Sequence, residues 1–222
     1  MTRDVAPPPE PVEDPPPSAR KVELLELAYR YVLEHGLTGL SLRPLTTAVG
    51  STPGVMLYLF GSKDGLVRAL LARARADELA LLHRLRERVA AARGAGEEGD
   101  AALAGPDAGL AGVAGQVWGW LAAREHRGLL TLWLEGYARS LLEPDGPWAG
   151  FARSTVEDWL DVLAEAQPPD LRDTEAGATQ RTFVLAVLRG AMLDLLATGD
   201  LDRIGTVVRQ QLTLLPTVAS AG

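Results

Sequence analysis

Apolar residues recur at helical spacing along most of the chain, and short polar or glycine-containing stops interrupt them. Between residues 18 and 36, for example, Leu24, Leu27, Ala28 and Tyr31 fall on one helical face. The same pattern, with its stops, predicts further helices within 41–50, 52–61, 62–93, 107–123, 125–142, 147–167, 174–197 and 200–215. No segment alternates with the period of a strand. The sequence therefore predicts an all-α protein of about nine helices.

The stretch 41–66 is unusually dense in residues that start and stop helices. The expected N-caps are Ser41, then Ser51 or Thr52, and Ser62, and the expected stops are Gly50 and Gly61. Pro44 and Pro53 suit first turns, where the missing N–H has no intrahelical partner. Two short helices joined by a tight glycine turn can hold one helix in the DNA major groove while the other crosses the backbone. This stretch predicts a helix-turn-helix.

The chain divides into three parts by composition. Residues 1–17 contain proline triplets at 7–9 and 15–17 and little that is apolar, so we expect a disordered Pro-rich arm. A solvated tail is favoured over a partner-docking segment. Residues 18–66 form the predicted three-helix DNA-binding domain. A long helix beginning after Ser62 joins it to a larger helical ligand-binding and dimerisation domain, 67–222, with a glycine-rich loop at 94–105.

Charge is distributed unevenly, although the net charge is −7. Residues 18–93 contain twelve Lys and Arg against seven acids, whereas residues 94–222 contain nine against eighteen. A basic end on an acidic body is expected if only that end meets phosphates. The alternative is that the arginines of the long helix merely solvate it.

Composition excludes several classes of protein. The chain has no cysteine, so disulfides, thiolate metal sites and a cysteine nucleophile are excluded. No uncharged apolar run is long enough to span a membrane, and the N-terminal residues have no apolar signal core. We expect a cytoplasmic protein without a membrane partner, a metal or a cofactor.

Residues 18–71 resemble the N-terminal domain of the tetracycline-repressor (TetR) family of bacterial transcription regulators. The matching positions align without gaps, and they are Gly36, Leu37, Leu40, Ser41, Leu42, Arg43, Leu45, Ala48, Gly50, Thr52, Pro53, Gly54, Tyr58, Phe60, Ser62, Lys63, Asp64 and Leu66. One position departs from the family pattern. The family usually has a phosphate-contacting Tyr where this chain has Leu57, followed by Tyr58. Either Tyr58 takes over that contact or the contact is lost.

The resemblance implies which residues meet a double-stranded DNA operator. Carried over by position, the groove-facing set is Thr52, Gly54, Val55 and Tyr58, and the phosphate-contacting set is Ser41, Arg43, Thr47 and Lys63. Lys63 is also unusual by itself, because a cation at a helix N-terminus opposes the helix dipole and a phosphate would relieve this. For Arg43 and Thr47 the alternative is ordinary exposed helix surface.

The body contains all five tryptophans, which suggests a ligand cavity between its helices. The candidate lining residues are Trp118, Trp133, Tyr137 and Met192, and the candidate polar anchors are Gln116, His126, Glu135 and Arg139. The alternative is that these aromatics simply fill the core.

The last two helices offer more apolar surface than one chain easily covers, so we predict that they form a homodimer interface. The candidates are Phe183, Val184, Val187, Leu188, Ala191 and Leu195 on one helix, and Ile204, Val207, Val208, Leu212 and Leu215 on the other. A twofold dimer suits a palindromic operator.

An enzyme is not expected. His35, His83 and His126 are scattered, and no HExxH, GxSxG or phosphate-binding glycine loop occurs. The sequence instead predicts a repressor that a small, largely apolar and unknown effector releases from DNA. The alternative is a helical small-molecule-binding protein or an enzyme without DNA binding.

Overall fold

The computed structural model describes residues 18–97 and 109–215, and all regular structure within these ranges is helical. The helices are α1 (Ala19–His35), α2 (Leu42–Ala48), α3 (Pro53–Phe60), α4 (Lys63–Glu97), α5 (Leu110–Leu121), the 3-10 turn η2 (Arg124–His126), α6 (Arg127–Leu142), α7 (Phe151–Glu165), α8 (Pro169–Arg172), α9 (Glu175–Thr198) and α10 (Leu201–Thr213). The all-α prediction is confirmed. The pattern missed α8, a single turn that starts at Pro169. The predicted arm, 1–17, lies outside the described residues.

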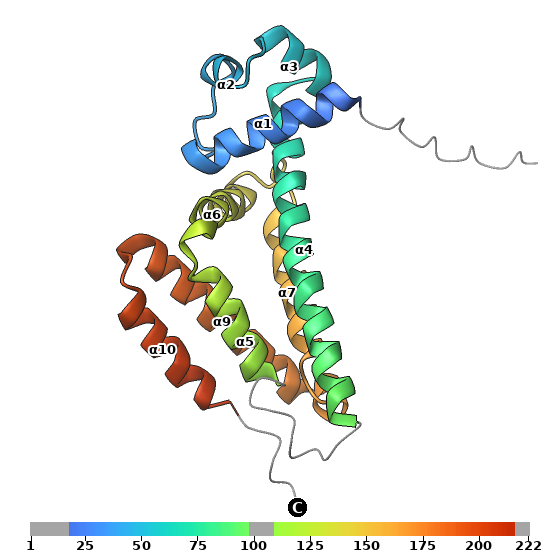
Figure 1. The fold of residues 1–222 in the computed structure, drawn as a ribbon, viewed down its shortest axis with the longest axis vertical. Helices are drawn as coiled ribbons and strands as arrows, with labels where there is room; N and C mark the ends of the chain where they lie inside the picture. The colour runs from blue at the N-terminus through green and yellow to red at the C-terminus, as the bar shows by residue number, and fades with distance from the viewer. Residues whose placement is uncertain (1–17, 98–108, 216–222) are drawn as a thin grey trace, which may run out of the picture.

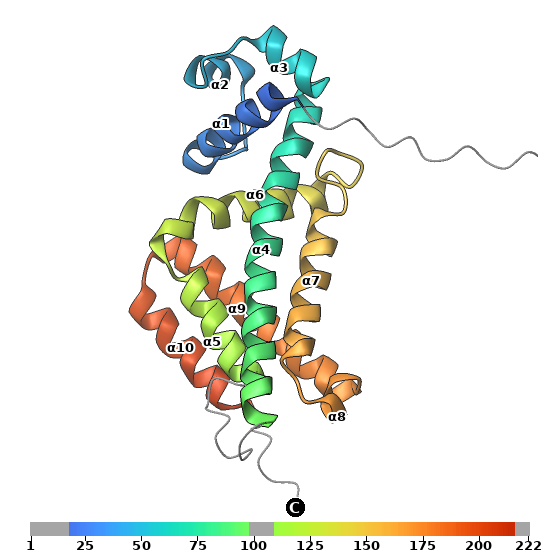
Figure 2. The ribbon, with the colours of Figure 1, turned by 45° about the vertical axis from the view of Figure 1, so that its right-hand side comes forward.

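The helices form a small head and a larger body joined by α4. Figure 1 shows α1, α2 and α3 at one end of an elongated molecule, with α4 running from this head along the body. Figure 2 shows α4 and α7 side by side, and α9 packs against α7, α5 and α10. Helix α6 lies across the head end of the body and contacts α1, α4 and α7. None of the described helices is long and apolar enough to cross a membrane.

The caps of the head helices follow the sequence prediction at two of three starts. Thr52 Oγ1 accepts from the Val55 N–H at 3.3 Å, and Ser62 Oγ accepts from the Gly65 N–H at 2.9 Å. Ser41 occupies the N-cap position of α2, but its side chain makes no cap hydrogen bond, so this part of the prediction is wrong. The reason is Pro44, the third helical residue, which lacks the N–H that a serine cap commonly binds.

The head is tied to α4 by packing and by polar contacts. The buried apolar side chains form one cluster that runs from Leu24 and Leu45 in the head, through Leu70 on α4, into the body. The Tyr29 hydroxyl donates to Asp77 of α4 at 2.8 Å. Burial and this carboxylate raise the Tyr29 pKa, so the phenol stays protonated and can keep donating.

Candidate functional site

The eight predicted DNA-contacting residues all occupy exposed positions on one part of the head. Some lie just before or within α2, others just before or within α3, and Lys63 is the first residue of α4. The turn between α2 and α3 contains Gly50 with φ +64°, a backbone conformation that glycine adopts without strain. The inner faces of the two helices hold Leu45, Met56 and Phe60 in the core. This packing leaves the outer faces free.

The exposed surface formed by α2, α3 and the start of α4 carries two cations, Arg43 and Lys63, that have no ion-pair partner among the described residues. Neither Arg43 nor Lys63 makes an ion pair with any residue in the described ranges. The Thr47 hydroxyl donates back to the Arg43 carbonyl at 3.0 Å. Unpaired cations next to exposed hydroxyl groups can bind phosphate oxygens.

Tyr58 protrudes from α3. Its side chain is 87% exposed, and the preceding Leu57 is 39% exposed. Because adjacent helical residues differ in direction by about 100°, the two side chains leave α3 at different angles. A replacement phosphate contact requires an exposed hydroxyl, and Tyr58 has one. That Tyr58 takes over the contact stays a prediction.

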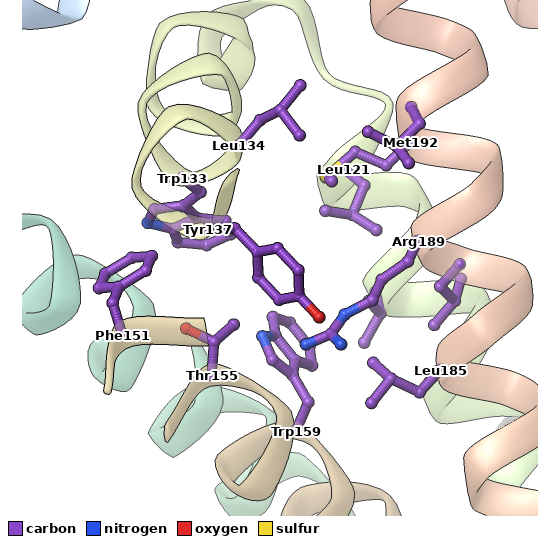
Figure 3. Close-up of a pocket in the computed structure, with 13 residues that line it drawn as sticks. Leu121, Trp133, Leu134, Tyr137, Phe151, Thr155, Trp159, Leu185, Arg189 and Met192 are labelled. Carbon is purple, nitrogen blue, oxygen red and sulfur yellow. The ribbon is translucent and has the colours of Figure 1, made fainter. Parts of the chain in front are cut away.

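A cavity of about 220 Å³ lies in the body between α5, α6, α7 and α9. Figure 3 shows Trp133 and Tyr137 on one side of it and Arg189 reaching in from α9. The predicted lining residues Trp133, Tyr137 and Met192 do line it. The assignment of Trp118 to this lining is wrong. Val117 and Leu121 face the cavity instead, and the Trp118 indole lies against Gly205 of α10.

The four predicted polar anchors do not line the cavity, because their side chains are engaged elsewhere. Gln116 accepts a hydrogen bond from Arg88 at 3.4 Å, and the His126 ring is hydrogen-bonded to the Trp120 carbonyl at 2.8 Å. Glu135 accepts hydrogen bonds from the backbone N–H groups of Leu37 and Thr38. Arg139 forms an ion pair with Glu143 at 2.5 Å. Sequence reasoning also missed the charged residue of the cavity lining, Arg189. A signal was present, since Arg189 interrupts an otherwise apolar run from Phe183 to Leu193.

A buried carboxylate lies behind the cavity wall. Glu78 on α4 is fully buried, accepts from the Trp159 indole N–H at 2.7 Å and pairs with Arg75 at 3.0 Å. Burial raises the Glu78 pKa, and the neighbouring Arg75 opposes this shift. Arg75 also pairs with Asp158 of α7. These contacts fix α4 against α7 behind the cavity.

Helix α6 touches both the cavity and the head. The Glu135 carboxylate accepts hydrogen bonds from the backbone N–H groups of Leu37 at 2.5 Å and Thr38 at 3.1 Å, just after α1 ends. Near the start of α6, Gly128 approaches α1 so closely that an added Cβ would lie 2.4 Å from the Leu33 carbonyl oxygen. The same helix presents Trp133 and Tyr137 to the cavity.

The predicted dimer residues divide into buried and exposed groups. Val184, Leu188, Ile204 and Val208 are at most 3% exposed within the single chain, so their assignment to a partner-facing surface is wrong. Five others are half-buried, and they are Val187, Ala191, Leu195, Leu212 and Leu215. Phe183 and Val207 are 42% and 48% exposed. The stripe of α9 that includes Phe183, Ala186, Gly190 and Leu193 faces outward instead.

No protein-family model and no curated protein matches the chain. Solved structures do match over most of its length. A TetR transcription regulator from Haloarcula marismortui has a TM-score of 0.59 at 16% identity and covers 87% of this chain and 94% of its own. The multidrug binding protein EbrR, complexed with imidazole, has a TM-score of 0.56 at 25% identity, over 90% and 92%. GusR from Salmonella enterica has a TM-score of 0.53 at 19% identity, over 87% and 93%.

The chain thus combines a helix-turn-helix head, a long connecting helix and a cavity-bearing body. More specifically, the chain has the fold of the TetR-family transcription regulators. The resemblance seen in residues 18–71 therefore extends, as a fold, over the body.

Proposed function

We propose that this protein is a ligand-responsive transcription regulator that binds a palindromic DNA operator as a homodimer and acts as a repressor. The observation that carries the proposal is the exposed outer face of α2 and α3, with Arg43 and Lys63 unpaired among the described residues. Thr52, Gly54, Val55 and Tyr58 would face the groove. The 18–66 segment is the DNA-binding domain in this proposal, and no catalytic role is assigned.

Helix α6 provides a physical route from ligand to DNA. A ligand between Trp133 and Tyr137 would shift α6, and Glu135 on the same helix holds the chain just after α1. The ligand can act only if it binds the shifted form more tightly than the DNA-bound form. Release from the operator would follow from this difference in affinity.

Small organic molecules are reasonable occupants of the cavity. The similar protein EbrR is described in complexes with imidazole and with proflavin, both of them ring compounds. We therefore propose Trp133, Tyr137 and Met192 as ligand contacts in this chain.

The homodimer would use the outward stripe of α9 and the exposed part of α10. Phe183 and Val207 are exposed apolar side chains on these helices, and α9 and α10 pack against each other as a hairpin. Two such hairpins can close a four-helix bundle with twofold symmetry. Such a dimer would present two heads to two half-sites.

DNA binding is tested with duplexes that the wild-type protein selects from a random pool. Fluorescence anisotropy then gives affinity over a range of salt concentrations. Lys63→Ala should weaken binding to all duplexes alike and reduce the slope of log affinity against log salt by about 1.8, because the homodimer loses one phosphate contact at each head and each contact contributes about 0.9. Thr52→Ser keeps the hydroxyl that caps α3 but removes the methyl group, so it should change the preference among duplexes.

The matched control is Arg153→Ala on α7, because the Arg153 side chain is 83% exposed and lies on the body. It removes one cation, as Lys63→Ala does, and should leave the affinity and the salt slope unchanged. If Lys63→Ala behaves like this control, and Thr52→Ser leaves the preference unchanged, the assignment of α2 and α3 to DNA is wrong.

A further inference from the structure

The cavity between α5, α6, α7 and α9 is mostly apolar, and its lining residues with a charged or hydroxyl-bearing side chain are Arg189, Tyr137 and Thr155. Most of its walls are leucine, valine, methionine and aromatic carbon, and its only charged lining residue is Arg189. Figure 3 shows the Arg189 guanidinium inside the cavity, with the Tyr137 hydroxyl pointing toward it. A cation and a phenol hydroxyl therefore share one end of a largely apolar space.

Arg189 is half-buried and lacks the ion-pair partner that a cation shielded from water normally has. Its Nη2 atom is buried without a hydrogen bond, and in the described part of the chain no carboxylate lies within ion-pair distance of it. Its nearest aromatic contact is the Tyr137 ring, whose centroid is 5.3 Å from Cζ. Burying a charge without a partner is costly, so such a group in a cavity indicates a missing anion.

The acid behind the wall does not fill this role. Glu78 attracts Arg189 through space, but it makes no ion pair with it, lies outside the lining, pairs with Arg75 at 3.0 Å and accepts from the Trp159 indole at 2.7 Å. A second lining residue, Trp133, also has a buried N–H without a partner. Both unsatisfied groups of the lining are donors, so a ligand that supplies acceptor oxygens suits the cavity.

We propose that the effector is an organic monocarboxylate with a compact apolar body, its carboxylate bound by Arg189 and Tyr137. This inference rests on the proposed function, since it names the ligand class of the same cavity. One cation balances one negative charge, so a dianion such as a phosphate monoester would remain partly unpaired. The volume of about 220 Å³ is roughly one and a half times the ~150 Å³ cavity that holds benzene, so a two-ring body fits.

Three probes that share one ring system test the charge of the ligand. They are 2-naphthoate, the neutral 2-naphthamide and the cationic 2-naphthylmethylammonium, and isothermal titration calorimetry measures their binding to the full chain. Charge-assisted hydrogen bonds favour the carboxylate, so naphthoate should bind the wild-type protein about tenfold or more tightly than the amide. The ammonium probe should bind most weakly, because Arg189 repels it.

Variants assign the preference to Arg189. Arg189→Met has a similar shape without the charge, so it should lower naphthoate affinity about tenfold or more and leave amide binding nearly unchanged. Arg189→Lys should keep part of the preference, and Tyr137→Phe should weaken only naphthoate. Arg153→Met, the same substitution at an exposed site on α7, should change none of the three affinities.

The outcomes separate this inference from the proposed function. If the amide or the ammonium probe binds the wild-type protein as tightly as naphthoate, the inference is overturned, while the cavity remains a ligand site. Thermal melting shows whether the Arg189→Met variant is folded. If the folded variant binds naphthoate as tightly as the wild-type protein does, the assignment of Arg189 is overturned. If no probe binds, the inference is also overturned, and the operator measurements still judge the proposed function independently.

Discussion

Removing the Glu135 carboxylate should loosen the head from the body by a measurable amount. Glu135 accepts from the Leu37 N–H at 2.5 Å and from the Thr38 N–H at 3.1 Å, and the first contact is partly buried whereas the second is exposed. A hydrogen bond to a charged group contributes about 1.5–3 kcal/mol, and an exposed amide recovers its bond from water. Counting only Leu37, Glu135→Ala should cost about 2 kcal/mol of the free energy of unfolding.

Thermal melting measures this loss. For a chain of this size, 1 kcal/mol corresponds to about 2–4 °C in Tm, so Glu135→Ala should lower Tm by about 4–8 °C. Wild type and variant must be compared at the same protein concentration, since the proposed dimerisation would make Tm depend on it. Glu135→Gln should fall between them, because an amide oxygen still accepts but carries no charge.

Glu143→Ala is the matched control on the same helix. Glu143 pairs with Arg139, and the two side chains are 43% and 38% exposed. Such surface pairs contribute about 0–1 kcal/mol, so Tm should hardly change. If Glu135→Ala lowers Tm no more than Glu143→Ala does, Glu135 does not hold the head to α6, and the proposed route from cavity to head loses its main contact.

Two further predictions concern the body. Arg189→Met should raise the free energy of unfolding by about 1–2 kcal/mol, because it removes an unpaired buried donor at the cost of a contact with the Tyr137 ring. Urea unfolding measures this change in stability. A less stable variant would show that Arg189 already has an adequate environment. Phe183→Asp, alone or with Val207→Asp, should convert the proposed dimer to a monomer in light scattering after size-exclusion chromatography. Leu141→Asp, at a 65% exposed leucine on α6, should not, and equal behaviour of the variants would move the interface elsewhere.

Local signals in the sequence were enough to predict the head. Thr52 and Ser62 cap their helices as expected, because an N-cap depends on residues within one turn. Ser41 fails for an equally local reason, the missing N–H of Pro44, which the same sequence already contained.

The body was harder to predict, because apolar periodicity does not say which neighbour a helix face meets. Helix α9 is apolar over much of its circumference, so Val184 and Leu188 were assigned to a partner although they face the chain's own core. Trp118 and Val117 are adjacent, and only the packing of α5 against α10 decides which of them lines the cavity. Arg189 gains its meaning from groups on other helices, which no local pattern contains.

The central claim is that the head binds operator DNA and that occupancy of the cavity weakens this binding. The most direct test is the affinity for a selected operator, measured by fluorescence anisotropy without and with 2-naphthoate at a concentration that calorimetry shows to be saturating. Wild-type protein should bind the operator with steep salt dependence, and 2-naphthoate should lower its affinity about fivefold or more. Glu135→Ala should still bind the operator, but 2-naphthoate should lower its affinity much less. Salt-independent binding, or an occupied cavity with unchanged operator affinity, would contradict the claim.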